Sequence, residues 1–100
     1  MNIEKVNSYI GFAVRAGDVV FGLDNIMTAR RAVHVIVKDS TLGEASLRKL
    51  TNYLEHHAIH LVTLEDELLG RDVLRRDKCK IVGILNESLA RAIIGEAESQ

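Results

Sequence analysis

Amphipathic helices alternate with short apolar strands along this chain, and that order restricts the possible fold more than any other feature. The clearest stretch runs from Gly11 to Thr41, where a helix, a strand, a second helix and a second strand are separated by glycines. The apolar run from Val33 to Val37 is typical of a strand that is covered on both faces of a sheet. The sequence therefore predicts an α/β protein with helices packed on both faces of one sheet.

Capping residues and apolar spacing define the first two helices. We expect the first helix from about Ile3 to Ala16, with Gly17 as its C-terminal cap. The second helix is expected to follow Gly22, with Asp24 as its N-cap, and to end near Arg31. A glycine at this strand-to-helix junction allows a phosphate or a base edge to approach the free N–H groups of the helix start.

Three further helices and four strands complete the predicted order. Thr41 and Glu44 fit a capping box for the third helix, and Asn86 is the expected cap of the last helix, which ends near Gly95 and leaves a frayed tail. The apolar positions of the third and fourth helices are Leu47, Leu50, Leu54 and Ala58, and Leu64, Leu68, Leu69 and Val73. The predicted strands are Val19–Phe21, Val33–Val37, Ile59–Val62 and Lys80–Leu85.

This αβαβαβαβα order predicts a three-layer α/β/α sandwich around a four-stranded mixed sheet. Residues 1–100 contain no proline, linker or repeat, so we expect a single domain. The single cysteine, the lack of a signal peptide and the lack of a long apolar stretch predict a cytoplasmic protein without a membrane partner.

Residues typical of catalysis are present, but their spacing favours no enzyme. His56, His57 and His60 cluster in the sequence, yet the third strand begins between them and breaks the helical spacing that a metal site needs. Cys79 has no partner cysteine, and no serine stands in a nucleophile motif. Gly22 is not followed by a nucleotide-binding glycine motif. We therefore expect no catalysis, no metal and no cofactor.

Charge and aromatic content limit the possible partners. The net charge is −1, so no global basic field holds nucleic acid, and only four residues are aromatic, which disfavours an RNA reader that stacks bases on a sheet face. Two basic clusters remain: Arg30, Arg31 and Lys38, and Arg71, Arg75, Arg76, Lys78 and Lys80. Solvated surface and an RNA-facing edge are both open interpretations of these clusters.

The segments IGFAVRAGDVVFG, VHVIVKDS, SLRKL and LLGRDV resemble the ribosomal protein L-seven-Ae family, and its small bacterial relatives in particular. The similarity covers roughly Ile10 to Ile94 by pattern. It implies the same α/β/α sandwich and binding of kink-turn RNA. It further implies that the start of the second helix meets tandem sheared G·A pairs, while an apolar loop before the last strand covers an extruded nucleotide.

Carried onto this chain, the resemblance implies an RNA site in two parts with flanking basic residues. The first part is Gly22, Asp24, Asn25 and Thr28, the second is Val73, Leu74, Arg75 and Arg76, and Arg31 and Lys38 are the flanking residues. The expected partners are structured RNA, ribosomal or regulatory, and with it the ribosome, rather than DNA.

The chain departs from the family pattern in the first part of this site. Many RNA-binding members have Asn or Lys where Asp24 stands and Lys where Thr28 stands, and Leu74 occupies a position that is often glycine. The segment from Gly22 to Asp39 is also about one helical turn shorter than in most relatives. A second hypothesis therefore stays open, in which the same fold has lost kink-turn binding and docks to a protein partner or to itself.

Overall fold

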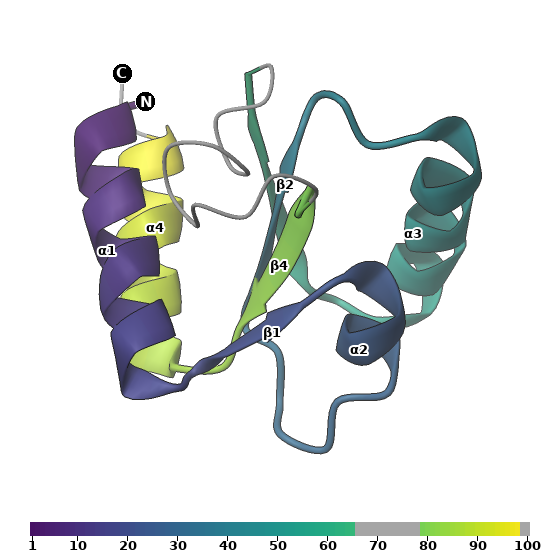
Figure 1. Ribbon diagram of the computed structural model, residues 1–100, viewed down its shortest axis with the longest axis horizontal. Helices are drawn as coiled ribbons and strands as arrows, with labels where there is room; N and C mark the ends of the chain where they lie inside the picture. Colours follow the sequence, from purple (N-terminus) through teal and green to yellow (C-terminus); the bar gives the residue numbers. More distant parts are fainter. Residues whose placement is uncertain (66–78, 99–100) are drawn as a thin grey trace.

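The computed structural model describes residues 1–65 and 79–98. In this part of the chain, four strands form one sheet and four helices cover it (Figure 1). The helices are α1 (Ile3–Ala16), α2 (Leu23–Met27), α3 (Glu44–His56) and α4 (Glu87–Glu98). The strands are β1 (Val19–Phe21), β2 (Val35–Asp39), β3 (His60–Leu64) and β4 (Ile81–Ile84). The predicted α/β architecture is confirmed.

The sheet is mixed, and the last strand lies inside it. The strand order is β1-β4-β2-β3, with β4 antiparallel to both neighbours and β2 parallel to β3. In the register, Val37 of β2 lies between Val82 of β4 and Val62 of β3. β4 therefore joins the first strand to the rest of the sheet.

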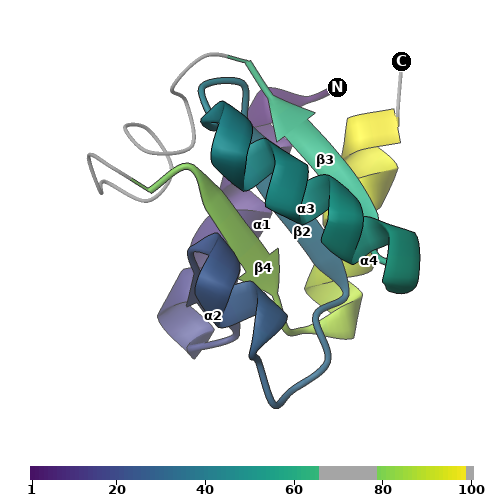
Figure 2. The same ribbon diagram turned by 90° about the vertical axis from the view of Figure 1, so that its right-hand side faces the viewer.

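Alternating side chains of the strands build two separate apolar cores. Along β2, Val35 and Val37 pack with α1 and α4, whereas Ile36 packs with α2 and α3. Because successive strand residues point to opposite faces, this alternation requires apolar cover on both sides. Figures 1 and 2 show the resulting three layers, with α1 and α4 on one face of the sheet and α2 and α3 on the other. The predicted sandwich is thus confirmed.

The first helix matches its prediction at both ends. Asn2 accepts a hydrogen bond from the backbone N–H of Lys5 at 3.2 Å, and Gly17 ends the helix with φ 73°. A left-handed residue at this position lets its N–H reach the last carbonyls of the helix, which glycine does without strain. α1 and α4 lie side by side on one face of the sheet (Figure 1).

The junction between the second helix and the second strand differs from the prediction. α2 ends at Met27 rather than near Arg31, because the backbone leaves the helical conformation at the C-cap Thr28, which has φ −107° and ψ 7°. β2 runs over Val35–Asp39 instead of Val33–Val37, since its extent is set by pairing with β3 and β4.

The region around the third helix also differs from the expected boundaries. Leu47 was expected on the buried stripe of α3 but is 40% exposed, while Leu50 is fully buried. β3 runs over His60–Leu64 and not Ile59–Val62, so Leu64 belongs to a strand and not to a fourth helix. The other apolar positions predicted for that fourth helix lie outside the described residues.

The last helix is longer than expected. The Asn86 side chain accepts the N–H of Leu89 at 3.0 Å, which confirms it as the cap. The helix continues past Gly95 to Glu98, so the tail is not frayed from Gly95 onward. Glu98 lies 3.1 Å from the His60 imidazole at the start of β3, and this contact ties the end of the helix to the sheet.

Gly83 allows the second helix to pack closely on the sheet. A β-carbon at this position of β4 would lie 2.9 Å from a methyl group of Val33 and 3.1 Å from side-chain atoms of Ile26 and Val20. These neighbours come from the loop after α2, from α2 itself and from β1, so none moves without disturbing an adjoining element. The absence of a side chain at Gly83 therefore sets how near α2 lies to β4.

We expect Gly83→Ala to destabilise the protein by about 1–3 kcal/mol, because the added methyl group overpacks a filled core. Gly95→Ala is the matched control, since a β-carbon at this exposed position of α4 meets nothing within 4 Å. The control should stabilise the protein by about 0.5–1 kcal/mol through higher helix propensity. Urea denaturation of both variants measures the difference, and equal free energies of unfolding would contradict the packing argument.

Candidate functional site

The junction between β1 and α2 depends on Gly22. Its φ of 88° and ψ of 149° lie in a region that is nearly restricted to glycine. Its N–H donates to the Ile81 carbonyl at 3.0 Å, which fixes the start of α2 against the start of β4. Gly22 is the N-cap, and no side chain of the described residues caps the helix, so the prediction of Asp24 as the cap is wrong. The first N–H groups of α2 are therefore left without a side-chain acceptor.

The third helix begins in the same way. Its N-cap is Gly43, again without a side-chain cap among the described residues, so the predicted capping box at Thr41 and Glu44 is wrong. The reason is a competing acceptor at the end of β2. The buried Asp39 carboxylate accepts the Thr41 N–H at 2.9 Å and the Thr41 hydroxyl at 2.7 Å. Thr41 is used to satisfy a buried charge and is not available to the helix.

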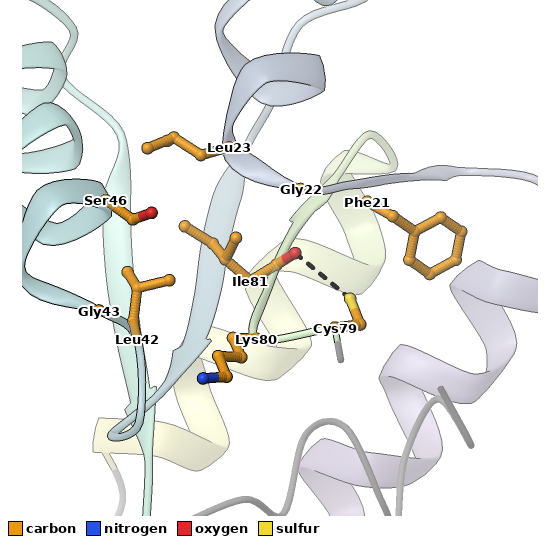
Figure 3. Close-up of a pocket in the computed structure, with 9 residues that line it drawn as sticks. All are labelled: Phe21, Gly22, Leu23, Leu42, Gly43, Ser46, Cys79, Lys80 and Ile81. Carbon is orange, nitrogen blue, oxygen red and sulfur yellow. Dashed lines mark hydrogen bonds between the residues drawn. The ribbon is translucent and has the colours of Figure 1, made fainter. Parts of the chain in front are cut away.

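Both glycine-capped helix starts border one open pocket of about 860 Å³ (Figure 3). Its lining residues are Phe21, Gly22, Leu23, Leu42, Gly43, Ser46, Cys79, Lys80 and Ile81. Figure 3 shows the side chains of Leu23, Leu42 and Ile81 gathered between the two helix starts, while the Phe21 ring points away from them. The Lys80 ammonium donates to the Thr41 carbonyl at 3.3 Å at the pocket's edge. The pocket thus has apolar walls and a cationic rim.

This arrangement suits an electron-rich, flat or anionic group. The starts of helices carry partial positive charge, and unpaired N–H groups there donate to phosphate oxygens or to acceptors on a base edge. Lys80 adds a full charge, and Ser46 adds a hydroxyl that donates or accepts. Apolar side chains between these donors shield a group that has left water.

The sequence-predicted residues of α2 lie together, but several of their polar groups are already used. Asn25 donates its amide to the Phe21 carbonyl at 2.8 Å, which braces the β1–α2 junction. Asp24 is exposed in the first turn, next to Gly22. Thr28 lies at the opposite end of this short helix, where its hydroxyl donates to the Asp24 carbonyl. The structure therefore places Gly22, Asp24 and Asn25 at the helix start and Thr28 away from it.

The two flanking basic residues separate from each other. Lys38 pairs in register with Ile81 on β4 and lies on the α2 and α3 side of the sheet, as the strand alternation requires. Arg31 lies beyond the other end of α2 and donates to the Asp18 carboxylate at 2.9 Å. Neither residue lines the pocket, although Lys38 pairs in register with Ile81, which does.

The second part of the predicted site, Val73, Leu74, Arg75 and Arg76, lies outside the described residues. The described chain resumes at Cys79 and Lys80, and both line the pocket beside Gly22. Sequence reasoning missed Gly43 and Ser46. The sequence did hold a signal for Gly43. Both helices begin after a glycine and have an acidic residue in the first turn, Glu44 in α3 and Asp24 in α2.

The histidines and the cysteine hold no metal arrangement. Within the described residues, no three His, Cys, Asp or Glu side chains are grouped as metal ligands. α3 ends at His56, and His60 starts β3 beside Glu98, so the two histidines do not share a helix. The Cys79 thiol donates to the Ile81 carbonyl at 3.6 Å (Figure 3).

An ion pair holds the loop after α2 to the end of α1. The Arg31 guanidinium donates to Asp18, and this hydrogen bond lowers the pKa of the Asp18 carboxyl below its usual value. The Asn86 amide, which donates to the other carboxylate oxygen at 3.3 Å, lowers the pKa further. Asp18 therefore joins segments from three places in the chain.

Comparisons with known proteins establish the fold but name no activity. No family model and no curated protein matches the chain. Among solved structures, the chain is similar to a protein with unknown function from Bacillus halodurans C, with a TM-score of 0.83 and 19% sequence identity. The match covers 95% of this chain and 98% of that one. Among residues 1–65 and 79–98, no helix combines the length and apolar character needed to cross a membrane.

The lowered pKa of Asp18 predicts how stability changes in acid. A carboxylate with a depressed folded-state pKa stabilises the protein above the unfolded value of about 3.9, and loses this contribution as pH falls through the folded value. We expect Asp18→Asn to be less stable than the parent protein near neutral pH, with the difference shrinking below about pH 4. Denaturation midpoints across this range measure it, with Glu4→Gln on α1 as an exposed-carboxylate control. A difference that stays constant with pH would contradict this role.

Proposed function

We propose that this protein is a non-enzymatic RNA-binding protein of the L-seven-Ae kind that recognises structured, kink-turn-like RNA. The observation that carries the proposal is the pocket into which two glycine-capped helix starts and Lys80 converge. It lies at Gly22, where the family resemblance implies contacts with sheared G·A pairs. Three kinds of group that RNA recognition uses, backbone donors, a cation and apolar walls, therefore occur together.

Non-Watson–Crick RNA offers groups that complement this pocket. Sheared pairs expose base-edge acceptors, and an unstacked nucleotide exposes a face that needs shielding from water. The N–H groups at the starts of α2 and α3 supply donors to such edges. Leu23, Leu42 and Ile81 supply the apolar surface. Recognition of this kind depends on geometry more than on net charge, which agrees with a chain of net charge −1.

The charge of the first helical turn limits the expected affinity. Asp24 is exposed beside the pocket, and a carboxylate facing phosphate is repulsive. Lys80, which lines the pocket, supplies a positive charge against this repulsion. We infer selective binding of moderate strength to a ribosomal or regulatory RNA in the cytoplasm.

A second candidate function is favoured by the opposite layer of the protein. Phe12 on α1 is 48% exposed, packs edge-on against Tyr9 and has the Arg15 guanidinium 5.0 Å from its ring centre. Aromatic residues and arginine are both enriched at protein interfaces. A same-fold module that has lost kink-turn binding would use such a surface to dock to a protein partner or to itself.

Titration with a kink-turn RNA, and with the same RNA lacking its G·A pairs, tests the proposed function. We expect selective binding to the intact kink-turn that weakens as salt rises. Lys80→Ala should lower the slope of log K against log salt by about 1, while Lys5→Ala on α1 should leave it unchanged. Equal, weak binding of both RNAs would exclude specific recognition and favour the protein-docking module.

Asp24→Asn tests the electrostatic limit on the same site. Removing the carboxylate while keeping its shape should strengthen kink-turn binding, by about threefold to tenfold, because a repulsive charge beside phosphate is lost. The gain should diminish at high salt, and Glu4→Gln in the opposite layer should produce none. If both neutralised variants gained equally, the effect would belong to net charge rather than to this site.

A further inference from the structure

A second pocket lies at the other end of α2 and α3. Its volume is about 610 Å³, and it is bordered by the loop after α2 and by the end of α3. Figure 2 shows α2 and α3 side by side on this face of the molecule. The first pocket opens at the starts of these two helices and the second at their ends, so both belong to one side of the sheet.

The second pocket combines apolar walls with two arginines and two histidines. Arg30, Arg31, His56 and His57 line it, and no carboxylate is among the lining residues that the structure describes. Arg30 is exposed and forms no ion pair or hydrogen bond with another described residue. Its guanidinium is therefore available to a ligand from solution.

Arg31 is held in place by its ion pair with Asp18. A guanidinium carries five donors in a fixed fork, so the bond to one carboxylate oxygen leaves donors for a second acceptor. Asp18 is the carboxylate that contacts Arg31, and the ion pair neutralises its charge. The other acidic side chain nearby in sequence, Glu55, is exposed on α3 and does not line the pocket.

An aromatic platform stands beside the two arginines. The rings of Tyr53 and His57 are stacked, with centres 4.1 Å apart and planes inclined by 17°. Tyr53 is half-buried and packs against the apolar cluster of α2 and α3, whereas His57 is exposed. One face of the His57 ring packs against Tyr53, and because His57 is exposed, we expect its other face to accept a further flat group.

The ends of helices carry partial negative charge, so basic residues also occur there without any ligand. That explanation accounts for His56, which contacts the Asn52 carbonyl through Nδ1 at 3.1 Å. It does not account for Arg30 in the loop, nor for a stacked pair of rings next to it. Phosphate-binding guanidinium groups beside a stacking surface are the combination by which proteins hold single-stranded RNA.

We propose that this second pocket binds a single-stranded RNA segment, with Arg30 and Arg31 on its phosphates and a base stacked on His57. The proposal extends the proposed function, since the strand would be one that leaves the structured RNA held at the first pocket. This second contact depends on the phosphates and bases of an unpaired RNA segment and not on a kink-turn. Its experimental test is independent of kink-turn recognition.

Titration of the isotope-labelled protein with a short unstructured oligouridine, followed by amide chemical shifts, tests the proposal. We expect the largest shifts in residues 28–34 and 53–59, and tripolyphosphate should not reproduce them at equal affinity. Absence of shifts in these segments would overturn the proposal. Equal binding of tripolyphosphate would also overturn it, because the pocket would then select anions without using the aromatic platform.

Variants separate the two contacts. Arg30→Ala should weaken oligouridine binding and reduce its salt slope by about 0.7, the value for one phosphate of a single strand. Arg91→Ala, on the opposite layer, should change neither quantity. His57→Ala should weaken binding by about fivefold, and His57→Phe, which keeps a ring, should restore it to within about twofold. Equal affinities of the Arg30 and Arg91 variants would contradict the proposal.

The two RNA hypotheses fail in different ways. If a kink-turn is bound no better than its G·A-less form while oligouridine still shifts residues 28–34, the first pocket lacks its proposed function and the second keeps its own. If kink-turn selectivity is present and Arg30→Ala changes nothing, the second pocket is solvated surface. Thermal unfolding of each variant ensures that a loss of binding is not a loss of fold.

Discussion

The backbone pairing at the start of β4 is the constraint on which the candidate site depends. The Gly22 N–H donates to the Ile81 carbonyl, and the Asp39 N–H donates to the Lys80 carbonyl at 2.9 Å. These two bonds place the chain before α2 and the chain before α3 on either side of one short strand. β4 thereby determines that two distant helix starts border one pocket, and Gly83 further along the same strand determines how closely α2 lies above it.

The sequence predicted most accurately those features that are determined locally. α1 has the expected bounds because its cap residues, Asn2 and Gly17, act within a few residues of the helix. The first strand has its predicted bounds, whereas the bounds of the other three differ by one or two residues, since the limits of a strand are set by partners far away in the chain. The alternation of apolar residues identified both faces of the sheet, because burial on a strand follows a period of two.

The capping of α3 shows why a local motif failed. Thr41 and Glu44 have the right spacing, but the Thr41 hydroxyl donates to the Asp39 carboxylate, which is 1% exposed. Leaving that carboxylate without donors would cost more free energy than leaving the helix start uncapped. The N–H groups of a helix end can be solvated by water, whereas a buried charge without hydrogen bonds costs several kcal/mol. Gly43 then begins the helix, and its free N–H groups become part of the pocket. The spacing of residues in the sequence does not show that Asp39 and the start of α3 compete for Thr41.

The positions of the charged side chains at both pockets are set by contacts in the fold and not by the overall composition. The family resemblance implied Arg31 as a residue flanking the site at Gly22, yet Asp18 holds it at the far end of α2. Because of this ion pair, Arg31 lines the second pocket together with Arg30 and does not line the first. A chain with a net charge of −1 lacks the long-range field that draws nucleic acid to a basic protein. The proposed RNA binding therefore depends on short-range geometry, in backbone donors at one end of the helices and in fixed guanidinium groups at the other.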